Sequence, residues 1–256
     1  MLHPGSSPFQ GNIGDKTHYR GLSPEMQSIL QDLSRLSHAL CHAISCGDTA
    51  VDPRPLDENL IHIHHAILKL LAPVSTPDRL SSSISTFTLI GDLNEATAIV
   101  ALLFAKSLSR GTGSVASHKR PIIRRLFSLL FRIHKYLIAN GSEKTNFQPY
   151  YSAGVSTLVS PRFLFWLHFM GGIAAQGSEA EFFEESLMNC LAIGSSHNWG
   201  SDVPSMPWQI LPSWQDIKEM LVEVLWFPLF YDELGERLWE LVVNGSKFIP
   251  TLDEMI

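Results

Sequence analysis

The sequence predicts an all-α protein, a compact multi-helix array in a single domain that follows a loose leader. Apolar residues recur at helical spacing along most of the 256 residues, which is typical of amphipathic helices that share one core. No convincing alternation of apolar and polar residues is visible, and the one short β-like run, STFTLI at 85–90, is isolated. With 45% hydrophobic and 17% charged residues, the chain can bury a substantial core.

The N-terminal part is predicted to be a disordered leader followed by two helices. Residues 1–22 are rich in Gly, Ser, Pro and His and lack periodicity. A helix begins at Ser23-Pro24, and Gly47 is a natural stop. A second helix covers about 56–71 after a turn-rich break. Its predicted inner face consists of Leu60, Ile63, Ile67, Leu68 and Leu71.

The middle of the chain predicts two further helices. Asp92 and Glu95 have capping-box spacing before the apolar run AIVALLFA, so a helix is expected from Asp92 to Arg110. The segment GTGSVASHKRP is expected to be a flexible basic loop. Pro121 then begins the next helix, IIRRLFSLLFRIHKYLIAN, because proline suits the first helical position.

The most apolar stretch runs from Phe163 to Ala175. A membrane-spanning helix needs roughly 20 apolar residues, and runs of about 10–14 are more often core helices. Ser160 and Pro161 fit the start of such a helix, so a buried helix is predicted here. Its interior glycines, Gly171 and Gly172, each cost about 1 kcal/mol relative to alanine. With Ala174 and Ala175 they predict a smooth strip for close packing of another helix backbone.

Two more helices are predicted near the C-terminus. Ser213 and Asp216 form a second capping box before WQDIKEMLVEVLW, in which apolar residues line one face. Pro228 is expected to break this helix, and Asp232 is expected to begin the last one, which continues through Leu241.

Two groups of metal-ligand residue types lie on shared helix faces. His38, His42 and Cys46 follow one another at four-residue intervals, but tetrahedral zinc needs a fourth ligand. The second group, in DENLIHIHH, lacks the second helical copy that carboxylate-bridged di-metal bundles use; it consists of Glu58, His62 and His65. Both groups fit the polar flank of an amphipathic helix better, so no metal site is predicted.

A short basic cluster offers a different kind of site. It consists of Lys119, Arg120, Arg124 and Arg125. Such a cluster is compatible with a nuclear-import patch or with contact to an acidic partner, and equally with a solvated junction between a loop and a helix. Motifs of hydrolases, P-loops and zinc proteases do not occur in the sequence.

Two C-terminal segments resemble the helical regulatory domains of fungal transcription factors, which usually follow a six-cysteine binuclear zinc cluster. The first is FLFWLHFMGGIAA with the acidic and aromatic EAEFFEESL; the second is WQDIKEMLVEVLWFPLFYDELGERLWELV. NEATAIVALLFAKSL at 94–108 is similar to an earlier helix of these domains. The resemblance covers roughly 24–245 and is strongest over 161–243. The landmarks matched in the second segment are Trp214, Leu221, Leu225, Trp226, Asp232 and Trp239.

The resemblance implies a non-enzymatic transcription regulatory domain over 23–256 that acts in the nucleus through transcription-related proteins or subunits of its own family. The six-cysteine cluster is missing, because the chain has three cysteines in all, Cys41, Cys46 and Cys190. A net charge of −6 also disfavours DNA binding by the chain alone. The expected structural landmarks are Trp166, Gly171, Gly172, Trp214, Trp226 and Trp239.

No catalytic residue, cofactor or membrane association is predicted. Binding of a small effector ligand is an open question, because no residue pattern in the sequence supports it. The alternatives are a small helical metalloenzyme built on one of the two His-containing groups, or a helical scaffold unrelated to transcription.

Overall fold

A computed structural model describes residues 19, 21–46, 53–72, 86–108, 116–141, 159–196 and 212–244. These residues form eight α-helices and no strand, which confirms the all-α prediction. The helices are α1 (Pro24–Ser45), α2 (Pro53–Leu71), α3 (Thr86–Leu108), α4 (Ala116–Gly141), α5 (Pro161–Ala174), α6 (Ser178–Ser196), α7 (Trp214–Val224) and α8 (Pro228–Asn244).

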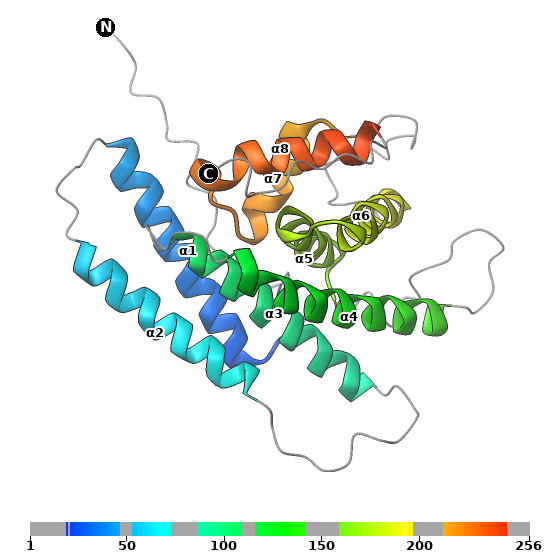
Figure 1. Cartoon of the computed structure of the whole chain (residues 1–256), viewed down its shortest axis with the longest axis horizontal. Coiled ribbons are helices and arrows are strands. Elements are labelled where there is room, and N and C mark those ends of the chain that lie inside the picture. Colours follow the sequence, from blue (N-terminus) through cyan, green and yellow to red (C-terminus); the bar gives the residue numbers. More distant parts are fainter. Residues whose placement is uncertain are drawn as a thin grey trace, which may run out of the picture.

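Helix α5 is the central element of the fold. It packs against α3, α4, α6, α7 and α8, and every residue from Phe163 to Gly172 is buried. Figure 1 shows α1 and α2 beside α3 at one end of the molecule and α7 and α8 at the other, with α5 between them. The short apolar run therefore forms a core helix, as its length predicts.

Helix starts follow the predicted capping residues in two places. Ser23 Oγ accepts a hydrogen bond from the Met26 N–H at the start of α1, and Pro24 takes the first helical position. Ser213 and Asp216 form the predicted capping box at the start of α7, with both reciprocal hydrogen bonds present.

The start of α3 differs from the prediction. The helix begins at Thr86, so residues 86–90 of the β-like run are helical and Asp92 lies inside the helix. The capping-box assignment of Asp92 and Glu95 is therefore wrong. Both carboxylates instead bind arginines of α4. A helix cap and an ion pair to a neighbouring helix both use acidic side chains. The spacing of acidic residues in the sequence therefore does not distinguish these two roles.

Two proline assignments also change. Helix α4 begins at Ala116, so Pro121 lies inside the helix and does not start it. Helix α8 begins at Pro228 and not at Asp232, because proline at a first helical position loses no hydrogen bond. The predicted break after α7 is therefore a short link, 225–227, that leads directly into the next helix.

Two residues of the predicted leader belong to the core. Tyr19 and Leu22 are buried, and Tyr19 Oη donates a 2.8 Å hydrogen bond to the Val224 carbonyl. On α2 the predicted inner face is correct except for Leu68, which is 53% exposed. Within the described residues, Thr88–Leu108 of α3 is long and apolar enough to cross a membrane, but 67% of its 18-residue apolar window is buried inside the protein, as in a core helix.

Candidate functional site

The first group of candidate metal ligands does not come together. His38 is half-buried on α1, whereas His42 and Cys46 are exposed at the end of this helix. Cys46 Sγ lies 3.7 Å from His42 Nε2, so these two approach each other. His38 does not join them as a third ligand within the part of the chain that the structure describes.

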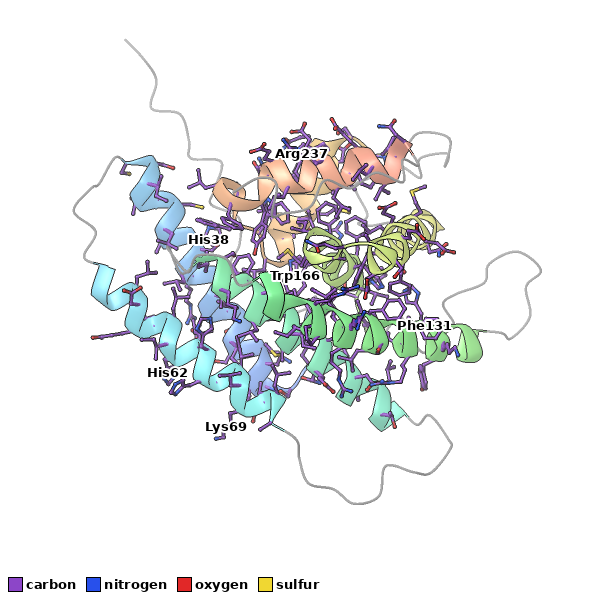
Figure 2. All side chains as sticks on the ribbon, in the orientation of Figure 1. His38, His62, Lys69, Phe131, Trp166 and Arg237 are labelled. Atoms are coloured by element: carbon purple, nitrogen blue, oxygen red, sulfur yellow. The ribbon has the colours of Figure 1, made fainter. Side chains whose placement is uncertain are left out.

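The second group of candidate metal ligands lies on the exposed face of its helix. Glu58, His62 and His65 are all exposed on α2. Figure 2 shows His62 on the outer side of this helix. The described residues supply no further carboxylate or histidine that would complete a metal site around them.

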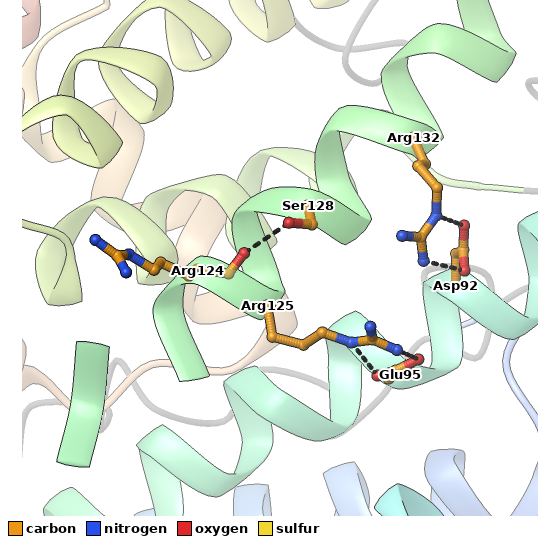
Figure 3. A network of polar contacts seen from close by, with 6 residues as sticks. All are labelled: Asp92, Glu95, Arg124, Arg125, Ser128 and Arg132. Atoms are coloured by element: carbon orange, nitrogen blue, oxygen red, sulfur yellow. Dashed lines mark hydrogen bonds and ion pairs between the residues drawn. The ribbon is translucent and has the colours of Figure 1, made fainter. Parts of the chain in front are cut away.

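The basic cluster is partly neutralised by ion pairs. Arg125 donates two hydrogen bonds to Glu95, at 2.7 and 3.0 Å, and Arg124 binds Glu179 at 3.1 Å. The hydrogen bond from Arg124 lowers the pKa of Glu179. Figure 3 shows Arg125 facing Glu95 across the gap between α4 and α3. Arg120 is exposed, and the side chain of Lys119 lies outside the described residues.

A more buried ion pair lies at the same interface, one turn away on α3 and two turns away on α4. Arg132 Nε and Nη2 each donate a 2.8 Å hydrogen bond to the carboxylate of Asp92 (Figure 3). The Asp92 side chain is 8% exposed and that of Arg132 is 39% exposed. This bidentate pair joins α3 to α4 and explains why a buried acidic residue occurs in an apolar helix.

The tryptophan landmarks meet at the contact of α5 with α7 and α8. Trp166 Nε1 donates a 2.7 Å hydrogen bond to the Leu225 carbonyl, and Trp226 Nε1 donates one of 2.8 Å to Asp232. The Phe169 ring lies 6.1 Å from that of Trp214 and 5.9 Å from that of Trp226. Trp166, labelled in Figure 2, lies among packed side chains at the centre of the molecule.

The two glycines of α5 make room for side chains of neighbouring helices. A Cβ atom at Gly171 would lie 2.3 Å from the ring of Phe183 on α6. A Cβ atom at Gly172 would lie 2.9 Å from a terminal methyl of Leu238 on α8. The glycines therefore serve close packing, but they admit an aromatic ring and a leucine, and not the helix backbone that the sequence led us to expect.

One group of three potential metal ligands does converge within the described residues, and the sequence did not indicate it. It consists of His134 on α4, His168 on α5 and Cys190 on α6, whose ligand atoms all lie within 4.8 Å of one another. The two imidazole centroids are 4.8 Å apart. No spacing rule links these residues, because each comes from a different helix.

The surroundings of this group keep it uncharged. Burial lowers the pKa of His168 to about 3 and also lowers that of His134, so both imidazoles are neutral at pH 7. Burial raises the pKa of the Cys190 thiol to about 12. Rings of Phe182 and Phe183 border His168. Two neutral imidazoles and a thiol therefore lie close together in apolar surroundings.

The described residues define an all-α helical protein with an aromatic centre built around α5. Comparison with protein-family models, with curated proteins and with solved structures finds no match to this chain.

Proposed function

We propose that the chain is a non-enzymatic regulatory domain of fungal transcription factor type, which acts in the nucleus through contacts with other proteins. The resemblance to such domains is carried by two segments that are separate in sequence. The first corresponds to α5 and the beginning of α6, and the second corresponds to α7, α8 and the link between them.

The observation that carries the proposal is that these two segments pack against each other. Helix α5 contacts α6, α7 and α8, and Trp214 and Trp226 of the second segment pack against Phe169 of the first. Because the landmark residues are core residues, the resemblance concerns how these helices pack and not an exposed pattern of polar residues. We propose that the resemblance extends to the fold, and the function is carried over from the resemblance.

The charge distribution favours protein partners over DNA. The net charge is −6, and two arginines of the basic cluster are paired with carboxylates. Binding to phosphates without sequence specificity depends on several free cations. Transcription-related proteins or subunits of the same family are therefore the partners that we propose.

The test is a fusion of the chain to an unrelated DNA-binding module in a fungal reporter strain. We expect the fusion to change transcription, upward or downward, relative to the module alone. Gly171→Leu should abolish the change, because the new side chain would collide with Phe183. Gly91→Leu is the matched control: Gly91 is exposed on α3, and a Cβ atom there meets nothing within 4 Å.

The controls separate the alternatives. A fusion that is folded and nuclear but leaves transcription unchanged would contradict the proposal in favour of a scaffold unrelated to transcription. The metalloenzyme alternative would be favoured by two results together. The purified wild type would contain zinc or iron that is lost in His38→Ala or His62→Ala, and the fusion would leave transcription unchanged.

A further inference from the structure

We propose that His134, His168 and Cys190 bind a zinc ion between α4, α5 and α6. The three residues supply two nitrogens and one sulfur, which is a ligand set that zinc accepts. One ligand atom of each residue lies within 4.8 Å of the other two, and Cys190 Sγ lies 4.0 Å from His168 Nδ1. Zinc bonds of about 2.0–2.1 Å to nitrogen and about 2.3 Å to sulfur place tetrahedral ligands roughly 3.3–3.6 Å apart. Two ligand atoms must therefore move closer together by at most about 1.2–1.5 Å when the ion binds.

The hydrogen bonding of His168 presents a free lone pair. Its Nδ1 lies 2.8 Å from the Leu164 carbonyl oxygen. A carbonyl only accepts, so the proton is on Nδ1 and the lone pair is on Nε2. This Nε2 is fully enclosed and has no hydrogen-bond partner. An N–H bonded to a backbone carbonyl, with the other nitrogen free, is the usual arrangement of a metal-binding histidine.

The enclosed Nε2 is the observation that separates this group from an ordinary core histidine. A buried polar atom without a partner destabilises the fold by about 1–3 kcal/mol, and native proteins contain few of them. A zinc ion at Nε2 would remove this penalty. His134 is the half-buried member of the group, so the ion would enter from its side.

Binding changes the protonation of one residue. Both histidines are already neutral, which is the form that binds metal. The Cys190 thiol is protonated without metal, so Zn²⁺ forms the Zn–S bond as the S–H bond breaks and the proton goes to solvent. Water would fill the fourth position. The ion would join three helices, including both helices of the first resembling segment, so it would stabilise their packing, and the zinc proposal does not depend on the proposed transcriptional function.

The test uses the purified full chain, treated with a chelator, desalted and given Zn²⁺. We expect about one zinc per chain to stay bound after desalting, about one proton to be released per zinc, and the melting temperature to rise. Cobalt(II) in place of zinc should give a thiolate charge-transfer band, because only a sulfur ligand produces one.

The variants assign the ligands. His134→Phe should lose bound zinc while it keeps an aromatic ring beside Phe182, and Cys190→Ser should lose the cobalt–thiolate band. His62→Gln and Cys46→Ser, in the exposed groups on α2 and α1, are the matched controls and should bind as the wild type does. The proposal is overturned if the folded wild type retains no zinc. It is also overturned if both ligand variants still bind zinc, or if a control variant loses it.

Discussion

At the scale of single residues, the centre of this protein contains polar groups in apolar surroundings. Tyr19 Oη and Trp166 Nε1 each donate to a backbone carbonyl in or next to the link between α7 and α8. The N–H of Trp166 is satisfied at Leu225, so the ring can be buried completely without a desolvation penalty. His168 is different, because only one of its two ring nitrogens has a protein partner.

The buried His168 should make the stability of the metal-free protein depend on pH. Burial lowers its pKa to about 3, whereas an unfolded histidine titrates at about 6.5. Below pH about 6.5 the unfolded chain binds the extra proton, so the free energy of unfolding falls as the pH falls. Between about pH 7.5 and 5.5 the wild type should lose about 1.4 kcal/mol more than His168→Phe, measured by urea unfolding with chelator. Equal losses would contradict the burial argument.

The two glycines of α5 should respond differently to alanine. The Phe183 ring is rigid and would lie 2.3 Å from the new methyl at position 171, whereas the Leu238 methyl beside position 172 ends a flexible side chain. Gly171→Ala should therefore destabilise the fold by roughly 1–3 kcal/mol, and Gly172→Ala should be near neutral because it gains helix propensity.

Melting temperatures of Gly171→Ala and Gly172→Ala, measured together with that of Gly91→Ala, test this difference in stability. Gly91 has open space around its Cα, so its variant reports helix propensity alone. Gly172→Leu should be destabilising, because a leucine exceeds what Leu238 can accommodate. Equal melting temperatures for Gly171→Ala and Gly91→Ala would rule out the packing role.

At the scale of helices, α3 and α4 are joined by two ion pairs that differ in how deeply they are buried. The carboxylate of Asp92 is 8% exposed, whereas Glu95 and Arg125 lie nearer to solvent, at 25% and 51%. Exposed pairs contribute about 0–1 kcal/mol, because water screens both charges. A buried charge that loses its partner costs more. The Asp92–Arg132 pair should therefore dominate the ionic coupling of the two helices.

Removing Arg132 should lower the free energy of unfolding more than removing the charge of Asp92 does. Arg132→Met leaves a buried carboxylate without its bidentate partner and should destabilise the fold by about 1–3 kcal/mol. Asp92→Asn leaves a guanidinium that is 39% exposed and can turn toward water, so its cost should be smaller. Urea unfolding of both variants and of Arg125→Met, the control at the exposed pair, measures the difference. A larger loss in Arg125→Met would contradict this ranking.

At the scale of the whole molecule, the chain should not bind DNA by itself. Its net charge is −6, it lacks six zinc-cluster cysteines, and the ion pairs of Arg124 and Arg125 reduce the free charge of its basic cluster. Mobility shifts at about 150 mM salt should show no sequence-specific complex, and at most weak retention that disappears as salt rises. Tight, specific binding by the chain alone would refute the charge argument.

The sequence by itself determined the fold class and the approximate places of the helices. Periodicity and capping are local properties, so Ser23 at α1 and the capping box at Ser213 were readable without a structure. The short apolar run identified α5 as a core helix by its length and composition.

Only the tertiary structure decided what individual side chains do. Asp92 fits a cap in sequence, but in the structure it pairs with Arg132 on the next helix. His134, His168 and Cys190 carry no shared signal, because they meet only after α4, α5 and α6 have packed. Helical periodicity states which face of a helix is buried but not which helix covers it, and the covering helix determines the partners of each buried group.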